Sequence, residues 1–235
     1  MRIYKLLLLG VALVLAAVPC LATPITFAGY TESAPTDITV TYSTPGGFPT
    51  NTITGAGAIT FFFENLGSVP AGLQGNLAAT LNFTASSTDP VLSGAQFRDQ
   101  EQYSGSFTIT LNSAYGAYAP GTFVLLAATF GPTNSDFAGT IGSMSFSDSR
   151  PPNSEVLFTS DANFLPLTPN GSEAFWLSMF NISPNLNTNP TNHMFTGFTA
   201  ASGGTFEGDI IPEPFSFLLL GSGLVGLGLL RRKLR

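Results

Sequence analysis

Alternation of apolar and polar residues is the feature that most limits how this chain can fold. It is clearest in residues 103–112, where apolar residues or glycine take every second position and serine, threonine or asparagine the positions between. Side chains of a strand alternate between two faces, so this segment predicts a strand with one buried face. The same pattern predicts about eleven short strands. They are expected at residues 25–30, 37–43, 58–64, 77–84, 103–112, 122–130, 140–147, 156–159, 174–182, 194–200 and 205–210.

Glycine and proline clusters separate these segments, as expected for tight turns. They lie at residues 44–47, 89–90, 119–121, 150–153, 168–171 and 202–204. No segment between the two ends of the chain has a helical period, and the asparagine-rich residues 181–192 predict a long surface loop. The pattern therefore predicts an all-β fold, an antiparallel β-sandwich or jelly-roll-like domain in which one face of each sheet is buried.

Phenylalanine is abundant enough to fill the core of such a domain. Nineteen of the 21 phenylalanines precede residue 215. Each aromatic side chain can bury roughly 150–250 Å2, and burial contributes about 25 cal/mol per Å2. A body of about 190 residues suits one domain, which we expect to fold without cross-links.

The last 25 residues differ from the rest of the chain. Residues 215–230 carry no charge, and as a helix they would rise about 24 Å, slightly less than the ~30 Å hydrocarbon core of a bilayer. Prolines favour an extended, non-helical segment before this span. The flanking residues are Pro212, Glu213 and Pro214 before it and Arg231, Arg232, Lys233 and Arg235 after it. The basic cluster is expected on the cytoplasmic side of the membrane.

The Pro-Glu-Pro triplet, the uncharged span and the basic cluster together resemble the PEP-CTERM sorting signal of exported bacterial proteins. This tail module is also labelled ice-binding protein C-terminal domain. The span is rich in glycine, as the resemblance requires, whereas Phe215 stands where a small residue is more usual. The resemblance implies that an exosortase, a membrane-embedded transpeptidase-like protease, recognises Pro212-Glu213-Pro214. The alternative is a plain single-span anchor in which the triplet only stops the helix.

The first residues have the pattern of a secretory signal peptide. Residues 1–5 include the basic Arg2 and Lys5, and thirteen apolar residues follow. Small residues stand three and one positions before Thr23, which predicts cleavage between Ala22 and Thr23. A lipoprotein signal acylated at Cys20 is the alternative, but Pro19 fits it poorly. Cleavage after Ala22 removes the single cysteine, so the mature chain would have no disulfide and no thiolate site.

The chain therefore divides into a signal peptide at residues 1–22, an exported β-sandwich domain at 23–210 and a sorting and membrane-anchor segment at 211–235. Between residues 23 and 214 there are two basic residues, Arg98 and Arg150, and fourteen acidic ones, a formal net charge of −12. Nucleic acids and anionic lipids are bound through lysine and arginine. The composition of the domain excludes both as partners.

Candidate catalytic residues are few. His193, the only histidine, stands in the asparagine-rich segment and is interpreted as a solvated loop residue, because no Gly-x-Ser-x-Gly motif or cysteine accompanies it. Asp99 and Glu101 beside Arg98 are the best carboxylate pair for a glycosidase. On one strand they would point the same way about 6.6 Å apart, whereas glycosidase carboxylates flank the scissile bond. We therefore expect solvated charges.

Three binding alternatives also arise from the sequence. Calcium stays open because Asp136, Asp148, Asp161 and Asn163 supply oxygens, although no Asp-x-Asp-x-Asp-Gly loop is present and no cofactor is expected. Ice binding would need Thr-x-Thr pairs stacked in register, but those at 39/41, 52/54 and 108/110 are scattered along the chain and are interpreted as ordinary strand faces. Trp176, among Phe175 and Leu177, is expected in the core.

Together these patterns predict an exported cell-surface or extracellular-matrix protein with a structural or adhesive role, and not an enzyme. Its expected partners are an exosortase-like membrane protease, the inner membrane through residues 215–230, and exopolysaccharide. A carbohydrate-binding module for exopolysaccharide is the first alternative. A secreted glycan hydrolase is the second.

Overall fold

The computed structural model describes residues 24–32, 38–43, 50–67, 69–94, 96–148, 155–165, 167 and 172–208. The elements are β1 (Ile25–Glu32), β2 (Ile38–Ser43), β3 (Asn51–Phe63), η2 (Ala71–Leu73, a 3-10 turn), β4 (Leu77–Ser87), β5 (Leu92–Ser93), β6 (Phe97–Glu101), β7 (Ser104–Leu111), β8 (Val124–Phe130), β9 (Ser135–Thr140), β10 (Ser143–Asp148), β11 (Leu157–Thr159), β12 (Ala174–Ser183) and β13 (Thr199–Gly208). The prediction of an all-β fold is confirmed.

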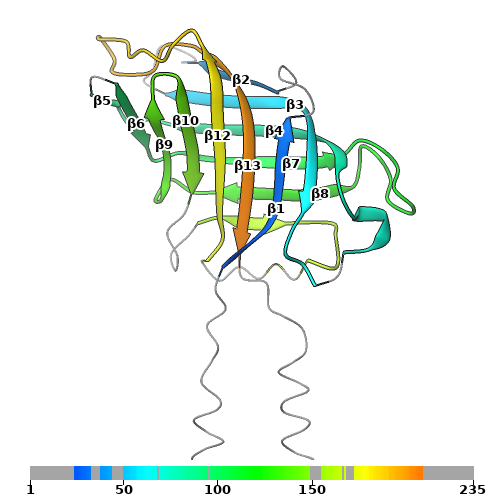
Figure 1. Cartoon of the computed structure of the whole chain (residues 1–235). Coiled ribbons are helices and arrows are strands. Elements are labelled where there is room, and N and C mark those ends of the chain that lie inside the picture. Colours follow the sequence, from blue (N-terminus) through cyan, green and yellow to red (C-terminus); the bar gives the residue numbers. More distant parts are fainter. Residues whose placement is uncertain are drawn as a thin grey trace, which may run out of the picture.

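All thirteen strands belong to one curled antiparallel sheet. The strand order is β11-β8-β7-β4-β3-β1-β13-β12-β10-β9-β6-β5, and β2 pairs with both β3 and β13. In Figure 1, β12, β13 and β1 form one layer, and β4 and β7 run across behind it. The structure thus differs from a sandwich of two unconnected sheets, because β1 and β2 both pair with β3 and β13 and make the two layers halves of one sheet.

Glu32 bridges the interval between β1 and β2. β1 pairs with the C-terminal half of β13, and β2 pairs with its first residues. Among the described residues, the β13 backbone between these two pairings has no strand partner on that side. The Oε1 atom of Glu32 accepts a hydrogen bond from the backbone N–H of Ser202 at 2.8 Å. The hydroxyl groups of Tyr30 and Ser202 also lie 2.8 Å apart, and burial raises the pKa of Tyr30 far above its usual value. The Tyr30 hydroxyl therefore stays neutral.

The core lies between the two halves of the sheet and is mostly phenylalanine, as predicted. Phe107 of β7 meets Phe206 of β13 with ring centroids 5.1 Å apart and Phe175 of β12 at 5.6 Å. Phe130 of β8 meets Phe175 at 5.0 Å, and Phe146 of β10 at 5.4 Å. These rings are almost completely buried. The aromatic contacts hold the two halves of the sheet face to face.

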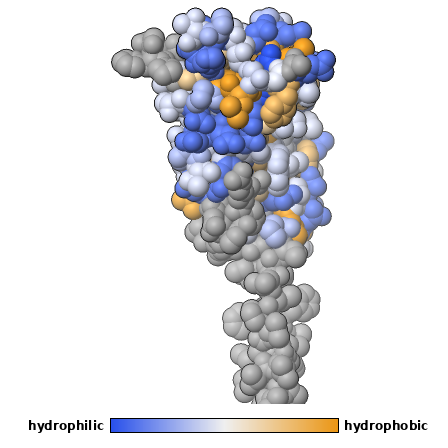
Figure 2. All heavy atoms as spheres, turned by 90° about the vertical axis from the view of Figure 1, so that its left-hand side faces the viewer, coloured by the Kyte–Doolittle hydropathy of each residue, from blue (hydrophilic) through white to orange (hydrophobic). Residues whose placement is uncertain are grey.

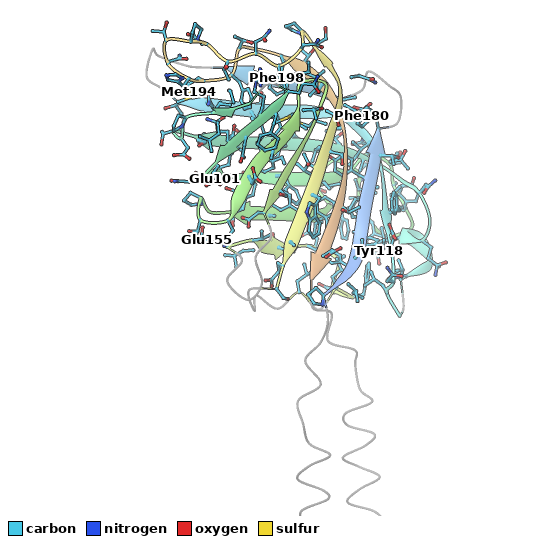
Figure 3. All side chains as sticks on the ribbon, turned by 60° about the vertical axis from the view of Figure 1, so that its left-hand side comes forward. Glu101, Tyr118, Glu155, Phe180, Met194 and Phe198 are labelled. Carbon is cyan, nitrogen blue, oxygen red and sulfur yellow. The ribbon has the colours of Figure 1, made fainter. Side chains whose placement is uncertain are left out.

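The first strand of the described domain begins beside the end of its last strand. Ile25 at the start of β1 is the direct partner of Gly208 at the end of β13. The loop between β12 and β13, residues 184–198, lies at the other end, where Figure 3 shows Met194 and Phe198. The terminal strands are also central in the sheet order, so the sheet is complete only when the last strand is present.

The asparagine-rich loop is held to the sheet by a buried polar cluster. The amide of Asn51 donates to Met194 Sδ at 2.8 Å, and the amide of Gln100 lies 3.7 Å from the same sulfur. Tyr103 donates to Gln100 Oε1 at 2.5 Å, and Gln100 Nε2 donates to the carbonyl of Asp89. The prediction of a surface loop is therefore right for most of the segment, but its first residues belong to β12 and the loop is fastened through Met194.

Two strand predictions need correction where short hairpins occur. Residues 140–147 were expected as one strand, but they contain the end of β9, a two-residue turn at Ile141 and Gly142, and most of β10. Glycine suits the tight geometry of such a turn. β6 was not predicted, because its sequence Phe-Arg-Asp-Gln-Glu has mostly charged and polar side chains, as strands near the edge of a sheet often do.

The predicted turn at residues 202–204 is also wrong, because β13 runs through it without interruption. A Cβ atom on Gly204 would lie 2.4 Å from Tyr30 Cε1 and 2.7 Å from Leu177 Cδ2. The glycine is there because neighbouring side chains cover the strand. Residues 194–200 and 205–210 thus do not form two separate strands.

No helix within the described ranges is long and apolar enough to cross a bilayer. The predicted signal peptide at 1–22 and the predicted sorting segment at 211–235 lie outside the described residues, and so do the turn clusters at 44–47, 150–153 and 168–171.

Gly105 provides a test of the close packing between β4 and β7. A Cβ atom at this position would lie 2.1 Å from the carbonyl oxygen of Thr84 and 2.7 Å from the Cα atom of Ala85, and backbone atoms cannot move aside cheaply. We expect Gly105→Ala to lower the free energy of unfolding by about 1–3 kcal/mol in chemical denaturation. The control is Gly67→Ala, where no atom lies within 4 Å of the new Cβ. Equal stabilities for the two variants would contradict this packing.

Candidate functional site

The most distinctive surface of the domain is the outer side of β3, β4, β7 and β8. Antiparallel pairing aligns Thr54 with Thr84 and Thr84 with Ser106, and the adjacent row aligns Asn82 with Thr108. Residues directly opposite each other share a face, so these side chains all point outward. We call this surface the hydroxyl face. It comprises Thr52, Thr54, Thr60, Thr80, Asn82, Thr84, Ser86, Ser104, Ser106, Thr108, Thr110 and Thr129, all exposed or half-buried.

The strand alternation that builds the core also builds this face. In β4 the inward positions are Leu77, Ala79, Leu81, Phe83 and Ala85, and the residues between them point outward. Neighbouring strands are about 4.8 Å apart, and successive outward residues on one strand are about 6.8 Å apart. The outward polar side chains of β4 and β7 are therefore regularly spaced in two dimensions, and alanines at 56 and 58 interrupt the array on β3.

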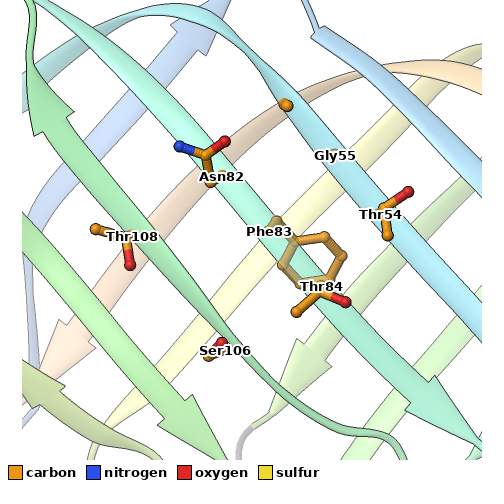
Figure 4. Close-up of a pocket in the computed structure, with 8 residues that line it drawn as sticks. Thr54, Gly55, Asn82, Phe83, Thr84, Ser106 and Thr108 are labelled. Carbon is orange, nitrogen blue, oxygen red and sulfur yellow. The ribbon is translucent and has the colours of Figure 1, made fainter.

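A shallow hollow of about 530 Å3 lies in the middle of the hydroxyl face. Figure 4 shows its lining on three neighbouring strands. The small residues Gly55 and Ala56 belong to the lining, with Phe83 beside them. Its polar side chains are those of Thr54, Asn82, Thr84, Ser106 and Thr108.

The hydroxyl face is uncharged. None of the outward positions of β3, β4 and β7 carries an acidic or basic residue. Hydroxyl groups can both donate and accept hydrogen bonds, and the amide of Asn82 does the same through two different atoms. Some of this capacity is used internally, because the Thr80 hydroxyl donates to Asn112 Oδ1 at 2.6 Å. Outward-facing hydroxyl and amide groups of this kind suit hydrogen bonding to an uncharged ligand.

The structure brings the Thr-x-Thr pairs together on nearby strands of the sheet. Although they are scattered in sequence, they lie on β2, β3 and β7, strands that pair with β3 or β4 in register. β2 is described only by its backbone, where Thr41 pairs with Thr54. Sequence spacing could not reveal this array because β4 stands between β3 and β7.

Trp176 is also placed differently from the prediction. It alternates with the buried residues Phe175 and Leu177 and is half-buried on the outer side of β12. Its direct partners are Ser147 on β10 and Thr205 on β13. The apolar composition around Trp176 suggested burial on both sides and was misleading.

The best carboxylate pair lies where the strand geometry predicts. Asp99 and Glu101 are on the outward side of β6, and the inward residue Gln100 is between them. Arg98 donates through Nη1 to the carbonyls of Gly94 and Phe97 at 2.7 and 2.8 Å, so its guanidinium closes its own hairpin turn. His193 is exposed, as predicted, and its backbone carbonyl accepts a hydrogen bond from Val91.

Metal-binding candidates do not assemble within the described ranges. No group of three or more histidine, cysteine, aspartate or glutamate side chains in these residues could hold an ion. Asp161 instead accepts a hydrogen bond from the backbone N–H of Val124 at 2.8 Å. Asp136 and Asp148 lie on neighbouring strands but on opposite faces of the sheet.

Apolar residues are exposed at a few positions. Figure 2 views the side of the domain where β5 and β6 lie and shows a mostly polar surface with small apolar spots. Leu92 on β5 is 61% exposed and Phe97 on β6 is 49% exposed. A second hollow, of about 510 Å3, lies beside η2 and is lined mainly by Phe63, Leu66, Val69 and Leu73. Its lining contains no titratable side chain.

Asp148 is a buried carboxylate at the end of β10. Neither of its oxygen atoms has a hydrogen-bond partner among the described residues. Burial raises its pKa to about 6, and the negative charge of Glu155 adds to this shift. Glu155 itself, labelled in Figure 3, accepts hydrogen bonds from the hydroxyl and N–H of Thr133, which lower its pKa.

No family model, curated protein or solved structure matches this chain.

Asp148 should make the stability of the domain depend on pH. Its pKa is higher in the folded state than the usual 3.8, so the charged form costs stability above pH 6 and this cost disappears as the pH falls from about 6 towards 4. We expect Asp148→Asn to raise the free energy of unfolding at pH 7 by about 1–2 kcal/mol. The gain should shrink below pH 6.

The measurement is thermal or denaturant unfolding of both proteins between pH 4 and pH 8. Glu101→Gln, on the exposed side of β6, serves as the control and should behave like the unmodified protein. A pH-independent difference between Asp148→Asn and the unmodified protein would show that the charge of Asp148 is not the cause.

Proposed function

We propose that this protein is an exported, exosortase-sorted cell-surface or extracellular-matrix protein with a structural or adhesive role. In this proposal, a two-layered sandwich-like domain follows a signal peptide and precedes the PEP-CTERM-like tail. The observation that carries the proposal is the pairing of Ile25 with Gly208, which puts both ends of the domain at one point. A leader and a tail attached there would both face the same membrane.

The distance from the domain to the sorting motif supports this arrangement. Three residues separate Gly208 from Pro212. Such a segment spans at most about 14 Å, so the motif would lie directly below the base of the folded domain. The asparagine-rich loop lies at the opposite end and would point away from the membrane. A tail of this kind presents the whole domain to the exterior.

The chemistry of the described residues favours a non-catalytic role. The strongly perturbed carboxylate, Asp148, is buried within the core side of the sheet, whereas Asp99 and Glu101 stand on an open strand face. The hydroxyl face, which extends over several strands, is instead an uncharged array of hydroxyl groups. A repeated array of weak hydrogen-bonding groups suits adhesion more than bond cleavage, which needs converging acid, base or nucleophile.

Mass spectrometry of protein released to the cell surface tests the sorting proposal. We expect the mature chain to begin at Thr23 and to lack residues 215–235. Replacing Pro212, Glu213 and Pro214 together by alanine should leave the uncleaved chain in the membrane fraction. Glu101→Gln is the matched control, because it removes a carboxylate far from the tail in sequence. A surface protein that still ends in Arg235 would refute sorting by cleavage.

A further inference from the structure

We propose that the hydroxyl face binds a neutral polysaccharide chain through the hollow centred on Asn82, Thr84 and Thr108. This inference deepens the proposed function, because export to an exopolysaccharide matrix would bring the ligand within reach. The binding itself depends only on the folded domain. It can therefore be tested apart from sorting.

The charge of the domain selects the class of polymer. With a formal net charge of −12 between residues 23 and 214, the domain repels polyanions at long range. The hydroxyl face adds no basic residue that could offset this repulsion. A positively charged polymer would be attracted to carboxylates, and the outward positions of β3, β4 and β7 carry none. An uncharged chain is the polymer that matches an uncharged face.

The hydrogen-bonding groups also fit a polymer rather than a single small molecule. Thr54, Thr84 and Ser106 form one row across three strands, and Asn82 and Thr108 belong to the next. Rows of this kind repeat at about 4.8 Å per strand, a spacing similar to the length of one hexose ring. A sugar chain lying across the strands could thus meet a new hydroxyl group at each ring.

The hollow gives the chain a place to lie. Its volume of about 530 Å3 falls within the range of about 300–1,000 Å3 that small-ligand sites occupy. Ala56, the outward partner of Asn82, makes part of its lining low, so a ring could approach closely. The hydroxyl groups of Thr84 and Thr108 form no hydrogen bond with another described residue and are available to a ligand.

The surface around Trp176 is the competing candidate for sugar binding. Tryptophan rings stack on sugars, but this ring is half-buried on the other layer, between the rows of β10 and β13. It offers only part of its surface to a ligand. The hollow lies on the hydroxyl face, so we assign the ligand to that face.

The test measures retardation of the full chain, purified in mild detergent, in gels that contain dextran, soluble starch or glucomannan, with alginate as the anionic polymer. We expect retardation by at least one neutral polymer and none by alginate. The double variant Thr84→Val/Thr108→Val keeps the shape and β-branching of both side chains but removes two hydroxyl groups. Its affinity should fall by at least about fivefold, as expected for two lost hydrogen bonds.

The matched control is Thr140→Val/Thr205→Val, which removes two exposed hydroxyl groups from strands of the other layer. It should bind like the unmodified chain, and circular dichroism should show that both double variants are folded. The proposal is wrong if no neutral polymer retards the chain, if both double variants bind equally, or if Trp176→Ala alone abolishes binding. Shaping of ice crystals without polymer binding would also overturn it and assign the face to ice.

Discussion

Contact between phenylalanine rings across the interior is the interaction on which the rest of the structure depends. Phe107 on one half of the sheet packs against Phe175 and Phe206 on the other half. One sheet bends over itself only if its two halves are held together, and the buried rings supply that attraction through their large apolar area. Both outer faces, the one with Trp176 and the one with the hydroxyl groups, are consequences of this closure.

The junction of the two halves links the fold to the proposed function. β1 and β13, the first and last strands described, pair with each other near the middle of the sheet order. Their free ends therefore meet, and a membrane segment on either side would hold the domain by the same point. The hydroxyl face is built from internal strands, so attachment at that point leaves it uncovered by the chain ends of the domain. In the proposed function, anchoring and binding would use separate parts of one sheet.

Prediction from the sequence succeeded where a single strand carries its own pattern. The alternation in residues 103–112 predicts β7 almost to the residue. The pattern does not predict β6, because Arg98, Asp99 and Glu101 leave this strand without an apolar-polar alternation. The glycines at 203 and 204 look like a turn in sequence but lie within β13, where Gly204 makes room for Tyr30 and Leu177. The candidate site was missed for a related reason, because threonine pairs on separate strands become one array only when β4 aligns them.

The sequence by itself determined the all-β class, the phenylalanine core, and the acidic and nearly lysine-free composition, because each is written in local order or in composition. It also predicts a sorting signal at residues 212–235, from the resemblance of that segment to the PEP-CTERM pattern. Tertiary structure alone decided that the strands form one curled sheet, that Asp148 is buried without a partner among the described residues, and that the threonines form one face. These features depend on strand register, which is set by contacts between residues far apart in the chain.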